Sequence, residues 1–181
     1  MHGRFRIDNA DFLYVLSTFV FEPIRWIDRF GWRTLCPPER LGLFFFWREV
    51  GRRMGMRDLP ADYDTFERYN LEYECAHFRS TEAAHRVGTA TRDMFARWFP
   101  RPLRALVRRV MHALMDEPLL MAFGFPRPSP LLRGLVHAGL RARARVLRWF
   151  PPRRRPRLRT QMWRPTYPHG FCLEHLGPSL R

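Results

Sequence analysis

The sequence predicts an all-α protein, a single multi-helix domain of about six helices. Apolar residues recur at three- and four-residue spacing through most of the chain. No segment alternates apolar and polar residues as a half-buried strand does, and no glycine fingerprint follows a strand. The hydrophobic share of 46% and the aromatic share of 15% exclude a disordered chain, and 181 residues are enough to bury a sizeable core.

The first predicted helix runs from about Ala10 to Phe30. Asp8 or Asn9 can cap its first turn, and Gly31 is a helix-ending residue. Pro23 cannot donate a backbone hydrogen bond, so we expect a kink at this position. The apolar stripe is wide, and we therefore expect most of this helix to be buried. Its apolar positions are 12, 13, 15, 16, 19, 20, 24 and 27.

The middle of the chain predicts four helices and one short helical turn between proline and glycine signals. A helix begins at Cys36-Pro37 and ends at Gly55. The next spans 64–78 and turns Phe66, Tyr69, Tyr73 and His77 inward, and another spans 80–99. A helix over 101–116 carries apolar residues at core spacing, and a short helical turn follows at 118–123. The core-spaced residues of 101–116 are Leu103, Leu106, Val107, Val110, Met111 and Leu114.

The last predicted helix opens at Ser129-Pro130 and reaches about Phe150. It is basic and amphipathic. Prolines and arginines at 151–159 end the regular structure, because proline breaks helices and like charges repel. We therefore divide the chain into a helical domain, 1–150, and a basic, proline-rich C-terminal extension, 151–181.

The net charge of +15 is concentrated toward the C-terminus. Residues 1–117 hold 19 arginines and 16 acidic residues, whereas residues 118–181 hold 13 arginines and a single acidic residue, Glu174. Three interpretations of the basic segment stay open. It is a solvated surface, a peripheral contact with an anionic membrane, or a site of nonspecific phosphate attraction. No motif for sequence-specific nucleic-acid binding is present.

The sequence shows no export or membrane-spanning segment. No apolar run approaches the ~20 residues that a helix needs to cross a bilayer, and polar residues interrupt any signal-peptide core near the start. The three cysteines lack CxxC spacing, which favours buried free thiols in a reducing compartment. We expect a cytoplasmic protein whose membrane contact, if any, is peripheral. Four histidines fall on separate helices without an i, i+4 partner, so no metal site is indicated among them. They are His77, His85, His112 and His137.

Several stretches resemble the MpaB-type oxygenases, a family that includes the latex-clearing rubber oxygenases. They are "HGRF" at 2–5, "LYVLSTFVFEPIRW" at 13–26, "RFGWR" at 29–33, "FWREVGRRMG" at 46–55 and "FGFPRP" at 123–128. The resemblance implies that His2 matches the axial ligand of a b-type haem. In the next motif Thr18 keeps the family's threonine, while Leu16 replaces its histidine. Family members carry a further helical half before the matched histidine, so the chain resembles an N-terminally truncated, C-terminal portion of a larger haem-binding fold.

The resemblance also implies a function and a set of site residues. It implies an oxygenase that uses haem b and dioxygen on a lipophilic, isoprenoid-like substrate. Tyr14, Thr18 and Phe21 would line the pocket, and Arg25 would hold a haem propionate. Without the family resemblance, the same residues predict core packing. The Ser17 and Thr18 hydroxyls would then bond back to their own helix. Arg25 would form an ion pair with Glu22, three residues before it.

The rival interpretation is a helical module without enzymatic activity. Such a module would bind an anionic membrane or an acidic partner through residues 130–160. Whether the chain is itself an enzyme stays open at this level. Under either interpretation, an apolar wall left bare predicts self-association.

Overall fold

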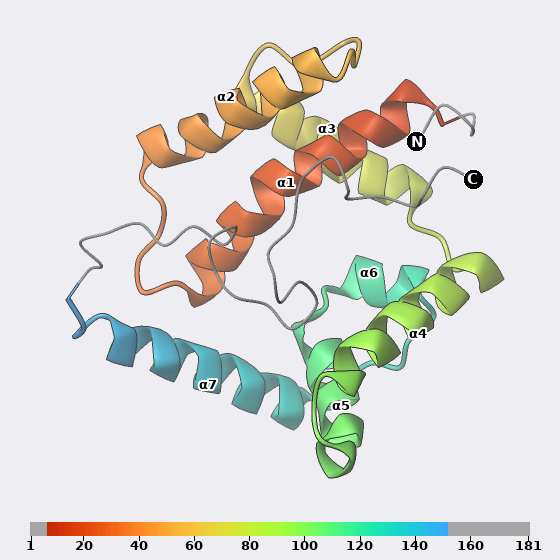
Figure 1. Cartoon of the computed structure of the whole chain (residues 1–181), viewed down its shortest axis with the longest axis vertical. Helices are drawn as coiled ribbons and strands as arrows, with labels where there is room; N and C mark the ends of the chain where they lie inside the picture. The colour runs from red at the N-terminus through yellow and green to blue at the C-terminus, as the bar shows by residue number, and fades with distance from the viewer. Residues whose placement is uncertain (1–6, 152–181) are drawn as a thin grey trace, which may run out of the picture. The chain divides into compact units, whose positions relative to one another are not determined.

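The computed structural model describes residues 7–151, and this part of the chain holds seven α-helices, one short 3-10 helix and no strand (Figure 1). The all-α prediction is confirmed. The chain divides into two units, residues 1–148 and 149–181, and every described helix lies in the first. The helices are α1 (Asn9–Phe30), α2 (Pro37–Arg53), α3 (Tyr63–His77), α4 (Glu82–Arg97), η2 (Arg101–Leu103), α5 (Arg104–Leu114), α6 (Glu117–Ala122) and α7 (Pro130–Leu147).

Three helices begin at polar side chains that satisfy an unpaired backbone N–H. Asp62 caps α3, Thr81 caps α4 and Ser129 caps α7. Each side-chain oxygen accepts a hydrogen bond from the backbone three residues on, at 2.8, 3.1 and 3.2 Å respectively. These bonds replace the partners that the first turn of a helix lacks. The starts of these helices are therefore fixed by local sequence.

Gly31 and Gly55 end α1 and α2 for different physical reasons. Gly55 has φ +76°, a left-handed conformation that side chains disfavour. Gly31 has an ordinary φ, but its N–H donates to the Ile27 carbonyl at 2.7 Å, and a Cβ on Gly31 would lie 2.5 Å from that oxygen. Both predicted helix ends are confirmed.

Some helix boundaries differ from the prediction. α1 is continuous across Pro23, whose expected kink stays a prediction. The helix expected at 101–116 consists of the 3-10 turn and then α5, because Pro102 follows Arg101 and the chain needs a tighter turn there. α7 ends at Leu147, three residues earlier than expected.

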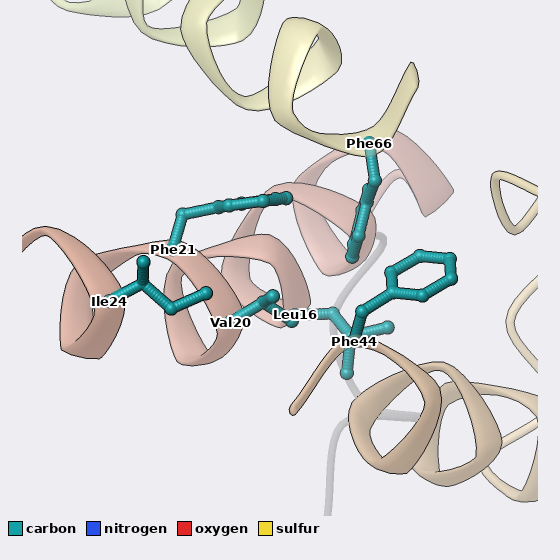
Figure 2. Close-up of a cluster of buried hydrophobic side chains, with 6 residues drawn as sticks. All are labelled: Leu16, Val20, Phe21, Ile24, Phe44 and Phe66. Carbon is teal, nitrogen blue, oxygen red and sulfur yellow. The ribbon is translucent and has the colours of Figure 1, made fainter. Parts of the chain in front are cut away.

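The core of the described region lies where α1 meets α2 and α3. Figure 2 shows Phe21, Phe44 and Phe66 directed toward one another from these three helices. The Phe21 and Phe66 rings meet edge to face at 5.6 Å, and the Phe44 and Phe66 rings at 6.2 Å. Edge-to-face geometry is favoured for aromatic pairs, and these three are the largest fully buried side chains among the described residues. Leu16, Val20 and Ile24 complete the cluster.

Only one face of α1 is buried, so the expectation that most of this helix is enclosed is wrong. Val15, Phe19 and Trp26 are 50%, 48% and 45% exposed. α1 is apolar on two faces, and α2 and α3 cover only one of them. Phe19 keeps a single described aromatic neighbour, Trp47, on which it stacks at 4.6 Å.

None of the six apolar residues predicted as core within 101–116 is fully buried, contrary to the prediction. Leu106 is 53% exposed, and the buried residues of α5 are instead His112 and Ala113. Periodicity predicted an apolar face correctly but not what would cover it. Two further expectations fail in the same way: His77 is exposed rather than inward, and Cys36 is a free thiol at the surface rather than in the core.

Cys75 is likewise free and exposed, and Cys172 lies outside the described residues. In the part of the chain that the structure describes, no helix is long and apolar enough to pass through a lipid bilayer.

Candidate functional site

The residues assigned to a pocket by resemblance share one face of α1. Tyr14, Thr18, Phe21 and Arg25 follow one another at intervals of four, three and four, which keeps them on one side of a helix. This face meets α3, which runs antiparallel to α1: Tyr14 contacts Glu74, whereas positions further along α1 contact earlier positions of α3. We call this contact the α1–α3 seam.

Tyr14 is held at one end of the seam by a carboxylate and an aromatic stack. Its Oη donates a hydrogen bond to Glu74 Oε1 at 3.3 Å. Its ring stacks on Tyr73 at 4.4 Å with an angle of 11° between the planes. Tyr73 in turn donates a short hydrogen bond to Asp11 at the start of α1. Both phenols of the stack are therefore paired with carboxylates.

Burial dominates the electrostatics at this end of the seam. It raises the pKa of Tyr14 well above the ordinary value for a phenol, and the charge of Glu74 adds to the effect. Burial also raises the pKa of Glu74, while the charge of Arg25 opposes that shift. Tyr14 is therefore a neutral hydrogen-bond donor at physiological pH, and Glu74 is a carboxyl group that holds its proton more firmly than an exposed glutamate.

Ser17 and Asn70 form a fully buried polar contact in the middle of the seam. Asn70 Nδ2 donates to Ser17 Oγ at 2.8 Å, and Ser17 Oγ donates to the Tyr14 carbonyl at 2.6 Å. Asn70 Oδ1 is buried and has no hydrogen-bond partner among the described residues. Thr18 bonds back to the Val15 carbonyl at 2.7 Å. The predicted back-bonding of Ser17 and Thr18 to their own helix is what the structure shows.

Phe21 is also buried in the seam and does not face an open pocket. It is 1% exposed and packs edge to face against Tyr63 at 5.2 Å as well as against Phe66. The described seam thus holds Tyr14 and Phe21 against α3. In the described structure both rings pack against other side chains of this chain. A role for either ring beside a flat cofactor stays a prediction.

Arg25 opens onto a charged groove of about 470 Å³, the Arg25 groove. Arg25 Nη1 pairs with Glu22 at 2.8 Å, the expected i, i+3 pair. Its Nη2 is buried, lies 4.0 Å from Glu67 and makes no hydrogen bond to any described residue. Arg25 is therefore the lining residue of this groove that also faces two carboxylates, Glu22 and Glu67. Its lining residues are Glu22, Arg25, Trp26, Asp28, Arg29, Leu114 and Asp116.

A second groove, the apolar groove, adjoins the first at Leu114, which lines both. It has a volume of about 450 Å³, within the range of small-molecule sites. Its lining carries no polar side chain. The remaining residues are Phe95 of α4, Phe99 just after that helix, Leu103 of η2, and Leu106, Val107, Val110 and Met111 of α5.

A third groove, of about 340 Å³, lies beside the start of α1 and is lined by Ile7, Asn9 and Phe12 together with the turn after α2. Asn9 fixes that turn through two bonds with Arg57: its Nδ2 donates to the Arg57 carbonyl at 2.8 Å, and its Oδ1 accepts from the Arg57 N–H at 3.0 Å. This groove is the one nearest in sequence to His2. His2 itself lies outside the described residues.

The described histidines form no metal site. Within residues 7–151, no group of three or more His, Cys, Asp or Glu side chains is placed to hold a metal ion. His85 and His137 bond to the carbonyls of Phe123 and Ala113 at 2.7 and 3.3 Å, and His77 bonds to its own helix. His112 stacks on Phe125 at 4.7 Å, and burial lowers its pKa.

Sequence reasoning missed Asn70, Glu74 and Asp116. Asn70 lies four residues after the core residue Phe66, so helical spacing would have placed it on the inner face of α3. Asp116 pairs with Arg29 at 2.9 Å across the Arg25 groove, a contact between residues 87 positions apart. No local signal could have joined them.

The chain matches a family model described as "ER-bound oxygenase mpaB/B'/Rubber oxygenase, catalytic domain" over residues 3–149. It is 26% identical over 161 residues to an ER-bound oxygenase mpaB' of Penicillium brevicompactum, with 82% of this chain and 38% of the relative covered. An ER-bound oxygenase mpaB of the same fungus is 39% identical over 64 residues, covering 34% of this chain and 16% of the relative.

The ER-bound oxygenase mpaB of Penicillium roqueforti (strain FM164) is 35% identical over 51 residues, covering 28% of this chain and 17% of the relative. The chain thus spans no more than 38% of the length of these relatives. No solved structure matches it.

Proposed function

Because this chain belongs to the family of ER-bound mpaB-type oxygenases and rubber oxygenase catalytic domains, we propose that it forms part of an oxygenase that uses haem b and dioxygen on a lipophilic substrate. The family match over residues 3–149 carries this proposal. Two properties of the described grooves support it: an arginine lines the charged groove, and the apolar groove adjoins that groove.

The described residues fit one end of a haem and not its ring faces. A propionate needs a cationic partner, and Arg25 lines a groove of about 470 Å³. Phe21, in contrast, is 1% exposed and packs against Tyr63 and Phe66 of α3. Arg25 is thus the described residue that would hold the cofactor, with His2 as the axial ligand implied by the family.

When bound, haem b supplies the iron at which dioxygen is activated, and the protein sets its polarity and access. The described residues contribute two functions beside it. Glu22 holds the Arg25 guanidinium in place at 2.8 Å. Trp26, which lines the same groove and is 45% exposed, restricts the access of water with its indole ring.

A lipophilic substrate is supported by the apolar groove. Its lining has no polar side chain, so it can accept a hydrocarbon chain without leaving a buried donor or acceptor unpaired. Leu114 joins it to the Arg25 groove. A chain bound along α5 would therefore end next to the proposed cofactor edge.

Haem retention by the purified chain tests the proposal. We expect hemin to give a Soret absorption band that remains with the protein through gel filtration. His2→Ala should lose the band, and Arg25→Gln should weaken it, because one propionate contact is removed. His77→Ala is the matched control, since His77 is an exposed histidine outside all three grooves.

The absence of a retained band in the wild-type chain would overturn the cofactor assignment for this molecule. A band in His2→Ala equal to that of the wild type would overturn the ligand assignment. Far-ultraviolet circular dichroism of each variant separates loss of haem from loss of fold.

A further inference from the structure

α7 turns one face toward the rest of its unit and leaves the other without described partners (Figure 1). Its inner face contacts α1 and α5. On this face the His137 ring meets Phe30 at 5.0 Å, and Arg133 pairs with Glu117 at 2.7 Å. Ala144 is the buried residue of the helix. These contacts fix which side of α7 points outward.

The outward side carries a continuous apolar stripe. At about 100° per residue, its members fall within one sector of about 80°. Leu131, Leu135 and Val146 are 74%, 62% and 58% exposed, and the smaller residues between them are exposed as well. The stripe is about 22 Å long at the helical rise. We define the α7 stripe as Leu131, Leu135, Ala138, Ala142 and Val146.

Arginines border the stripe on both sides. Arg141, Arg145 and Arg148 follow at intervals of four and three along one edge, and Arg143 lies along the other. Within residues 7–151 none of these four has an acidic partner, whereas Arg127 and Arg133, near the start of α7, both pair with Glu117. No acidic residue occurs anywhere in the sequence between Glu117 and Glu174.

We infer that α7 lies flat on an anionic lipid bilayer, with the α7 stripe between the lipid headgroups and the four arginines on lipid phosphates. An apolar sector flanked by cations along a single helix is the pattern of helices that bind in the plane of a membrane surface. The stripe requires an apolar phase and the arginines require anions. An anionic bilayer provides both, because its headgroup phosphates and its apolar interior lie only one side-chain length apart.

The two features together favour lipid over nucleic acid. Phosphates of a duplex would attract the same arginines, but they would leave Leu131 and Leu135 facing water. Each basic residue beside an anionic surface contributes about fivefold to binding. Removing Arg141, Arg145 and Arg148 should therefore weaken binding by about a hundredfold.

Co-sedimentation of the full chain with vesicles tests the inference, and it is done without hemin so that its outcome is independent of the cofactor proposal. The vesicles are phosphatidylcholine alone and an equal mixture of phosphatidylcholine and phosphatidylserine. The wild type should bind only the mixture. The triple variant Arg141→Gln, Arg145→Gln, Arg148→Gln should lose about a hundredfold in partition coefficient.

The matched control removes the same charge elsewhere. Arg52→Gln, Arg53→Gln, Arg57→Gln changes three exposed arginines around the end of α2 and should bind as the wild type does to within a few-fold. Equal losses in the two triple variants would overturn the inference, because binding would then follow net charge and not α7.

The stripe is tested separately with Leu131→Ser, Leu135→Ser. This variant keeps every charge and should still bind the mixed vesicles at least about tenfold more weakly than the wild type at the same low salt concentration, because the apolar contribution is removed. Undiminished vesicle binding would overturn the inference. A second result would also overturn it: duplex DNA displaces the wild type from vesicles, and the serine variant binds DNA as tightly as the wild type does. The arginines alone would then define the partner. Circular dichroism of each variant confirms that α7 and the rest of the fold persist.

Discussion

Glu74 shows how one residue can make the stability of this protein depend on pH. Its carboxyl group accepts a hydrogen bond from Tyr14, yet burial in the α1–α3 seam raises its pKa above the ordinary 4.5. The folded state therefore binds this proton more tightly than the unfolded state does. The resulting stabilisation is fully present below the unfolded pKa and is lost as pH rises through the folded pKa.

We predict that Glu74→Gln removes this dependence. The neutral amide still accepts the Tyr14 hydrogen bond but carries no charge to desolvate. Below pH 4.5 the variant and the wild type should be equally stable. Above it the variant should become the more stable, by less than about 1 kcal/mol, because solvent screens a partly exposed group. Urea unfolding across pH measures the difference.

Glu72→Gln is the control, since this neighbouring glutamate on α3 is exposed. A stability difference between Glu74→Gln and the wild type that stays constant with pH would contradict the prediction.

Single side chains also mark the limit of inference from sequence. The shared face of Tyr14 and Arg25 follows from helical spacing alone. The partners of that face do not, because Glu74 lies 60 residues further along the chain and Asp116 further still. The burial of Phe21 depends on how closely α3 approaches, which is a tertiary property that no local pattern carries.

At the level of helices, Gly51 of α2 packs directly against the side chain of Leu16 of α1. A Cβ at this position would lie 2.6 Å from Leu16 Cδ2 and 2.9 Å from Leu59 Cδ2. Leu16 belongs to the core cluster. The glycine thus sets the distance between the two helices.

We predict that Gly51→Ala and Gly42→Ala, on the same helix, have opposite effects. Gly51→Ala should cost about 1–3 kcal/mol, because Leu16 and Leu59 must move to admit the methyl group. Gly42 faces open space, so Gly42→Ala should stabilise the protein by about 0.5–1 kcal/mol through helix propensity alone. Denaturant midpoints of the two variants measure both effects. Shifts of the same sign would show that the packing around Gly51 tolerates a methyl group.

Helix identities were largely predictable because caps and breakers act locally. Asp62, Thr81 and Ser129 cap the starts of their helices through local hydrogen bonds, which do not depend on how the helices then pack. The inward face was harder to predict for α1 and α5. Both are apolar around more than one side, and spacing cannot tell a covered apolar face from a bare one. Phe19 and Leu106 are the residues on which that inference failed.

Across the whole molecule, exposed apolar side chains gather along α4 and α5 in the apolar groove. Patches of this kind drive association unless a ligand or partner covers them. We predict that the ligand-free chain self-associates, with a mass by light scattering that exceeds 21.8 kDa and rises with concentration. Leu106→Glu should shift the population toward monomer, because it places a charge in the groove.

Leu71→Glu is the matched control, since Leu71 on α3 is 52% exposed, close to the 53% of Leu106. It lies outside the apolar groove and should leave the mass unchanged. A monodisperse wild-type monomer would contradict the prediction.

The free surface thiols have a practical consequence for measuring this molecule in solution. Cys36 stands at the start of α2, and Cys75 lies on the outer side of α3. After Cys172→Ser, paramagnetic nitroxide tags can be attached to both native positions without touching the core. The distance between the tags, followed by pulsed electron spin resonance while hemin is added, then reports directly whether the two helices that flank α1 spread apart to admit a cofactor.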